Sequence, residues 1–146
     1  MLALLINVAA GWFMVGLIWI IQVVHYAQFN LIGETNWAAY HQRHVTMITP
    51  VVGPMMLVEL LSAIALLVRR PEALPAWIAW VSAALVLAMW VSTAAIQVPL
   101  HNKLAAGFDQ STYAALVNTN WLRTAGWSLR ALLVTWGLWL VMTKTA

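Results

Sequence analysis

Four long apolar stretches divide this chain, and they constrain its fold more than any other feature. A helix needs about 20 apolar residues to cross the hydrocarbon core of a bilayer. The chain is 64% hydrophobic and only 8% charged, whereas a soluble domain carries roughly 25% charged residues. We therefore predict an all-α membrane protein, in which residues 1–146 form a single up-down bundle of four transmembrane helices. The predicted spans are residues 4–28, 45–68, 76–100 and 121–142.

The first stretch is predicted to be a retained span and not a signal peptide. No basic residue precedes it, and it stays apolar to about Val24, which is longer than the apolar core of a signal peptide. The chain has no cysteine, which rules out thiolate metal sites, iron–sulfur clusters and disulfides. The net charge is only +3 and no basic run is present, so no nucleic-acid partner is predicted.

The charged turns predict how the chain is oriented. Cytoplasmic turns of membrane proteins carry an excess of Lys and Arg. The basic turn at 69–70 and Lys144 fall on one side of the predicted bundle, which we take as cytoplasmic. Arg43, Lys103 and Arg123 fall on the other side and argue for the opposite orientation. We expect a multi-pass membrane protein with both termini in the cytoplasm.

Most of the ten tryptophans are predicted to form aromatic belts at the two membrane interfaces. The indole ring is apolar and its N–H seeks a partner, so it favours the headgroup level. One belt contains Trp77, Trp80, Trp136 and Trp139, and the other contains Trp37 and Trp121.

Two prolines interrupt the second span. Pro50 and Pro54 each remove one helix hydrogen bond. They either kink the helix and open a cavity near the membrane midplane, or they are ordinary packing residues, since proline and glycine are common in membrane helices.

The helical period places the main polar groups of each span on one stripe, because residues three or four apart share a face. The stripes contain Asn7, Gln22 and His25 in the first span; His41, His44 and Glu59 in the second; Thr93, Gln97 and His101 in the third; and Asn120, Arg123 and Arg130 in the fourth. Polar groups that face lipid are costly, so the stripes are predicted to face one another.

The four histidines are the candidate metal ligands. His25 ends the first span, His41 and His44 begin the second, and His101 ends the third, so alternating helices bring all four to one membrane face. Imidazole suits iron, copper and zinc, and a pair at i and i+3 on a helix can point at one ion. The alternatives are a haem held by two histidines, and interfacial histidines that bind loops or lipid phosphates.

Four amides are predicted to support this site. Gln22 and Gln97 lie one turn from His25 and His101, where they are placed to hold the second ring nitrogen of a ligating histidine. Asn102 and Asn120 lie at the same level and offer hydrogen-bond donors to a cofactor or substrate.

Glu59, Arg123 and Arg130 form the candidate catalytic set. Glu59 is ten residues from Arg69, about 15 Å along a helix, and therefore lies near the membrane centre. Charges at this depth are costly, so Glu59 is predicted to pair with Arg130. The pair either fixes the helix register or supplies a carboxylate for proton transfer or metal binding. His44 lies about 22 Å along the helix from Glu59, so one metal cannot easily bind both.

Several motifs together resemble known membrane proteins. They are His25-Tyr26-x-x-Phe29; Tyr40-His41-x-x-His44; Pro54 with Glu59; Gln97-Val-Pro99-Leu-His101-Asn102; Gly107-Phe-Asp109; and Asn120-Trp121-x-Arg123-Thr-x-x-Trp127-x-x-Arg130. Over nearly the whole chain they resemble a group of uncharacterised bacterial four-helix integral membrane proteins, and this likeness implies a location in a bacterial inner membrane. A more distant likeness, in the Val98-Pro99 segment and the arginine-bearing fourth span, is to the anthrone-oxygenase-like membrane proteins. It implies oxygenation of an aromatic or polyketide substrate.

These features predict three alternative functions. The first is a metal-dependent redox or oxygenase-like enzyme that acts on a lipophilic substrate entering from the bilayer. The second is a b-type haem or quinone-binding electron carrier, with His25 and His101 as the axial pair. The third is a non-catalytic accessory subunit of a respiratory or photosynthetic complex. The expected partners are the lipid bilayer, a lipophilic small molecule, and further copies of the chain or a larger membrane complex.

Overall fold

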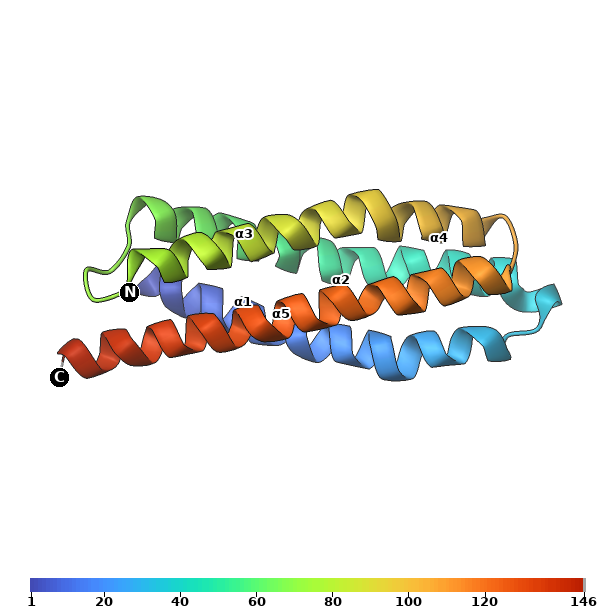
Figure 1. Cartoon of the computed structure of the whole chain (residues 1–146). Helices are drawn as coiled ribbons and strands as arrows, with labels where there is room; N and C mark the ends of the chain where they lie inside the picture. Colours follow the sequence, from blue (N-terminus) through green and yellow to red (C-terminus); the bar gives the residue numbers. More distant parts are fainter. Residues whose placement is uncertain (146) are drawn as a thin grey trace.

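A computed structural model, which describes residues 1–145, confirms the predicted all-α bundle of four long helices. The rods run antiparallel, and both termini lie at the same end (Figure 1). α1 packs against α2 and α5, and α3 packs against the same two helices, so the four rods form a square. No strand occurs in the described part of the chain.

Each rod is long and apolar enough to cross a membrane. The first consists of α1 (Leu2–Ile20), η1 (Ile21–His25) and η2 (Tyr26–Leu31), and the second is α2 (Glu34–Val68). The third consists of α3 (Ala76–Ser92), η3 (Thr93–Gln97) and α4 (Val98–Ala105), and the fourth is α5 (Gln110–Thr145).

Two rods begin before their predicted spans. α2 begins at Glu34, close to Trp37, from which the sequence also predicts helical turns ahead of the span at 45, whereas the start of α5 at Gln110 is not predicted. Both extensions belong to the end of the bundle that carries the histidines, so that end reaches beyond the apolar stretches. Asp109 precedes α5, where its Oδ1 accepts hydrogen bonds of 2.7 Å from the Thr112 N–H and the Ser111 hydroxyl. Hydrogen bonds from Thr112 and Ser111 lower the pKa of Asp109 to about 2.

Two short π-helical segments, η1 and η3, interrupt the rods, and η1 is followed by the 3₁₀ helix η2. η1 ends at His25, and η3 ends at Gln97, one turn before His101. A π-helical turn holds an extra residue and so rotates every side chain that follows it, and such turns often occur at functional sites. Both segments therefore help to set the direction of a histidine.

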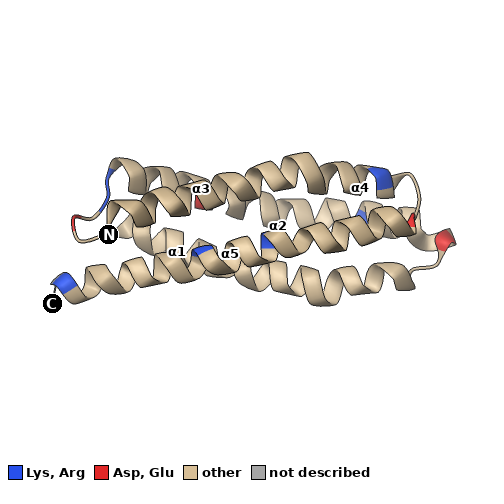
Figure 2. Cartoon of the chain, in the orientation of Figure 1, with Lys and Arg blue, Asp and Glu red and all other residues tan. Residues whose placement is uncertain are grey.

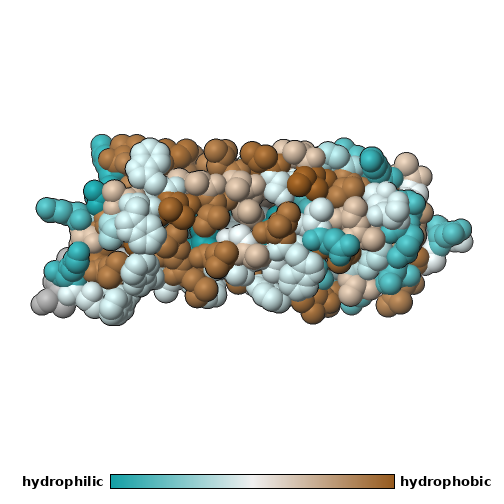
Figure 3. Space-filling model, in the orientation of Figure 1, coloured by the Kyte–Doolittle hydropathy of each residue, from teal (hydrophilic) through white to brown (hydrophobic). Residues whose placement is uncertain are grey.

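The surface is apolar along the middle of the bundle and polar at its two ends (Figure 3). Most Lys, Arg, Asp and Glu residues also lie at the ends (Figure 2). The exposed apolar side chains, such as Leu61 and Leu129, face outwards along the rods, as lipid contact requires. The molecule has the surface of an integral membrane protein.

The tryptophans differ in part from the predicted belts. Trp77, Trp80, Trp121, Trp136 and Trp139 are all exposed. Trp37 was predicted at an interface, but it is only 1% exposed and its Nε1 donates a 2.7 Å hydrogen bond to the Leu104 carbonyl oxygen. Its ring also packs edge-on against Phe108, so this tryptophan closes the histidine end of the bundle from inside.

Candidate functional site

The structure brings the four histidines together at one end of the bundle. The ring centroids of His25 and His44 are 4.5 Å apart, and those of His44 and His101 are 5.5 Å apart. His41 lies 5.3 Å from His101 and 6.3 Å from His44, again between ring centroids. We call these four residues the histidine cluster.

The imidazoles bind one another directly. His25 Nε2 lies 2.7 Å from His44 Nδ1, and His41 Nε2 lies 3.1 Å from His101 Nδ1. Each neutral ring carries one N–H, so each pair is joined by one hydrogen bond whose direction depends on the tautomers. In residues 1–145, no three histidine, aspartate or glutamate side chains are placed to hold one metal ion. Metal binding at the cluster therefore stays a prediction.

Tyr26 joins the cluster to Arg123. The Tyr26 hydroxyl lies 3.1 Å from His101 Nε2 and also hydrogen-bonds the Arg123 guanidinium. Arg123 Nη1 in turn donates a 3.0 Å hydrogen bond to Asn120 Oδ1. Sequence reasoning named Tyr26 only within a motif, because in an α-helix the neighbour of His25 points away from its stripe. The π-helical η1 just before it changes that direction.

The amides bind α5 and not the histidine rings. Gln22 Oε1 accepts a 2.7 Å hydrogen bond from Asn120 Nδ2, and Gln97 Nε2 donates to Thr119 Oγ1 at 3.1 Å. The sequence places these glutamines against the second ring nitrogens of His25 and His101. Among the described residues no such contact occurs, because both glutamine side chains point to α5. Asn102 is exposed and belongs to the wall of the cavity that lies beside the histidine cluster.

A cavity of about 350 Å³ lies beside the cluster, between α2 and the rod formed by α3, η3 and α4. His41, His44 and His101 line it, together with Tyr26 and Arg123. The remaining wall is mostly apolar, and its members include Ile48, Val52, Met56, Trp90 and Val98. We call this the α2–α3 cavity. Thr49 and Val98 on its wall are exposed on the lipid-facing surface, so the cavity opens sideways towards the bilayer.

The proline segment of α2 borders this cavity. Thr49, Val52 and Gly53 line it, while α2 remains one continuous helix through Pro50 and Pro54. Both alternatives for these prolines stay predictions.

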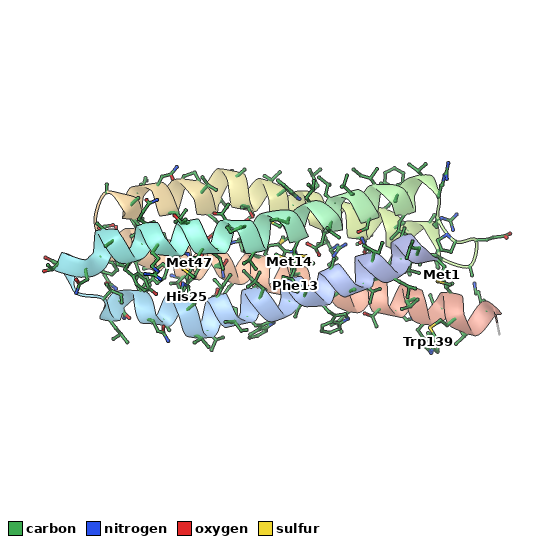
Figure 4. All side chains as sticks on the ribbon, turned by 180° about the vertical axis from the view of Figure 1, so that it is seen from behind. Met1, Phe13, Met14, His25, Met47 and Trp139 are labelled. Atoms are coloured by element: carbon green, nitrogen blue, oxygen red, sulfur yellow. The ribbon has the colours of Figure 1, made fainter. Side chains whose placement is uncertain are left out.

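A second cavity, of about 430 Å³, lies on the other side of His44, between α1 and α2. His25, Tyr40, Arg43 and Met47 line it with four aliphatic residues and His44. His25 and Met47 lie close together between the two ribbons at this end (Figure 4). His44 thus forms part of the wall of both cavities.

Glu59 and Arg130 form the predicted ion pair, deep in the bundle. Trp127 Nε1 donates to Glu59 Oε2 at 2.8 Å, and Arg130 Nη2 donates to Asn7 Oδ1 at 2.8 Å. Asn7 Nδ2 continues the network to Ser62 Oγ, also at 2.8 Å. Sequence reasoning named Trp127 only within a motif and missed Ser62, because their partners come from other helices.

This ion-pair network is separate from the cavities. Neither Glu59 nor Arg130 lines either of them. Their charges are balanced and hydrogen-bonded by side chains from α1, α2 and α5, which is the arrangement of a pair that fixes helix register. Of the candidate catalytic set, Arg123 alone lines the α2–α3 cavity.

Comparison with known proteins adds no relative: no protein-family model, no curated protein and no solved structure matches this chain.

Proposed function

We propose that this protein is a membrane-embedded oxidoreductase, of a redox or oxygenase-like kind, that acts on a lipophilic substrate. The single observation that carries the proposal is the placement of three imidazoles and a tyrosine in the wall of an apolar cavity that opens towards the bilayer. A lipophilic molecule enters such a cavity from the hydrocarbon without crossing water, and its reactive group then lies beside the histidine cluster.

The histidine cluster is the proposed place for a redox metal. Metal–imidazole bonds of about 2.1 Å place two ligating nitrogens roughly 3–3.4 Å apart. The His41–His101 nitrogens, at 3.1 Å, already have that spacing, and the His25–His44 nitrogens, at 2.7 Å, are close to it. His25, His41, His44 and His101 would hold the ion, in exchange for the two hydrogen bonds that now join them in pairs. Iron or copper fits a redox role, because zinc has no redox chemistry.

A haem between His25 and His101 fits the packing less well. A porphyrin must lie flat between its two axial imidazoles. The His44 ring contacts both of these histidines, with centroids 4.5 and 5.5 Å away, so it would have to leave before a porphyrin entered.

A metal-free quinone site is the second candidate function. It is favoured by the ring nitrogens, which bind one another and Tyr26 instead of converging on one point. Histidine and tyrosine N–H and O–H groups in the α2–α3 cavity are suitable donors for a quinone carbonyl, and neutral imidazole accepts the proton of a quinol.

Metal content and optical spectra of the purified protein test these alternatives. We expect about one iron or copper per chain in the wild type, and we expect His44→Ala and His101→Ala to lose it. Gln28→Ala is the control and should retain the metal, because the Gln28 side chain is exposed one turn after His25. An intense visible haem band would instead support the electron carrier. If the protein contains no metal but binds quinone, the quinone site replaces the oxidoreductase as its function. If it has neither property, the result supports an accessory subunit.

A further inference from the structure

Arg123 is a buried cation without an acidic partner. Its side chain is only 6% exposed, and the ion pair of Arg130 with Glu59 is the one salt bridge found in residues 1–145. Arg123 donates to the neutral Asn120 and stacks over Trp127, with its Cζ 4.9 Å from the ring centroid. Its Nε is buried and has no hydrogen-bond partner.

The other buried arginine of α5 provides the comparison. Arg130 lies two turns further along the helix, and there the protein supplies both a carboxylate and an amide oxygen. A buried charge is costly unless it is paired and hydrogen-bonded. Arg123 has only neutral partners, Asn120 and Tyr26, and it lines the α2–α3 cavity, so the missing negative charge has space next to it.

Four of the seven unpartnered buried polar atoms of the described residues belong to the wall of the same cavity. They are Arg123 Nε, Trp90 Nε1, Gln97 Oε1 and His41 Nδ1, whereas the other three, in Ser82, Ser92 and Arg130, lie away from it. Buried polar groups normally have partners, so an unpartnered group calls for an explanation. Two of these atoms are N–H donors, and oxygen atoms of a bound molecule are the partners that they lack.

We infer that the α2–α3 cavity binds a lipophilic oxyanion, a carboxylate on an apolar body, whose head group pairs with Arg123. The charge of the guanidinium selects the head group, and planar Arg–carboxylate pairs are among the strongest hydrogen-bonded contacts in proteins. The apolar wall formed by Val52, Met56 and its neighbours takes the body of the molecule. A volume of about 350 Å³ holds one such molecule with a medium-length chain or a two-ring body. This inference names the substrate class of the proposed function, but the binding itself needs no metal.

Binding of matched probes tests the inference. The full-length protein in nanodiscs of zwitterionic lipid is titrated with dodecanoate and dodecanol, and with 2-naphthoate and 2-naphthalenemethanol, while tryptophan fluorescence is followed. Each acid is expected to bind about tenfold or more tightly than its alcohol. The first pair tests an aliphatic body and the second an aromatic one, so their relative affinities show which source of carboxylate the cavity prefers.

Three variants locate the binding. Arg123→Gln is expected to weaken carboxylate binding at least tenfold and to leave alcohol binding unchanged, and Arg123→Lys is expected to restore part of the preference. The matched control Arg43→Gln removes an arginine that lines the second cavity and should change nothing. Gly53→Leu places a side chain in the α2–α3 cavity, where a Cβ meets no atom within 4 Å, and should block acids and alcohols alike.

Equal binding of acids and alcohols by the wild type would overturn the inference, as would full carboxylate affinity in folded Arg123→Gln or Gly53→Leu protein. Metal analysis of the same samples separates this inference from the proposed function. A metal-free wild type that still prefers carboxylates overturns only the oxidoreductase, whereas a metal-loaded wild type without the preference overturns only the oxyanion site.

Discussion

The Nε2 atom of His25 and the Nδ1 atom of His44 lie 2.7 Å apart and join the end of the first rod to α2. This hydrogen bond separates the two cavities, because His25 lines one of them and His44 lines both. The first rod reaches α2 here just after its π-helical turn. The contact therefore links packing at the histidine end to the site itself.

A double-mutant cycle tests this contact. His25→Ala and His44→Ala each remove one partner and are expected to show a coupling free energy of about 0.5–1.5 kcal/mol in detergent unfolding, which is the net value of one hydrogen bond. Gln28→Ala, one turn away and exposed, serves as a control that should not couple to either. Purely additive losses would mean that the two rings contribute independently.

Removing one partner of the Glu59–Arg130 pair is expected to destabilise the protein more than replacing both partners. Glu59→Leu or Arg130→Met alone leaves a lone charge in the core and should lower the free energy of unfolding by about 3–5 kcal/mol. The double variant removes both charges and should cost much less. If the double variant is as damaged as either single one, the carboxylate has a role beyond pairing.

Gly11 is expected to be required by Arg130. A Cβ at Gly11 would lie 3.2 Å from Arg130 Nη1. The guanidinium has little freedom to move, because Nη1 donates to Glu59 and Nη2 donates to Asn7. Gly11→Ala should therefore unfold at a lower temperature than Gly16→Ala. Its free energy of unfolding should be lower by about 1 kcal/mol or more. Gly16 lies on the same helix with no atom within 4 Å of its Cβ, so both alanines gain the same helix propensity. Equal thermal stability of the two variants would show that Arg130 shifts freely.

Asp109 is expected to make the start of α5 sensitive to acid. Its pKa in the folded protein, about 2, is below the ordinary value of 3.8, so its stabilising effect is complete above pH 4 and is lost as the pH falls towards 2. Asp109→Asn keeps a capping oxygen without the charge, and it should show a lower thermal midpoint at pH 7 with less change between pH 5 and pH 2. If the wild type and Asp109→Asn lose stability in parallel between pH 5 and pH 2, Asp109 is not the source of the acid sensitivity.

Cysteine labelling tests the orientation. The chain has no native cysteine, so single cysteines at Glu72 and Lys103 report the two ends of the bundle without background. A membrane-impermeant reagent applied to cells is expected to label the Lys103 position and not the Glu72 position, if both termini are cytoplasmic. The reverse pattern would invert the orientation, and labelling of both positions would contradict a spanning bundle.

The sequence by itself determined the four rods, the common end of the histidines and the ion pair. Hydropathy is a property of one stretch at a time, and lipid requires each apolar stretch to form a complete helix. A charge in the core needs a counter-charge, and Glu59 and Arg130 lie at matching depth. These inferences need only length, period and charge.

The tertiary structure alone decided where the rods begin, how the amides pair and where the cavities lie. α2 and α5 extend into polar segments because those turns pack on other helices, and hydropathy does not register such packing. The π-helical turns η1 and η3 change the direction of His25, Tyr26 and His101, and an extra residue in a turn leaves no simple mark in the sequence. The α2–α3 cavity exists because side chains from separate rods leave space next to Arg123, and that space depends on all of them at once.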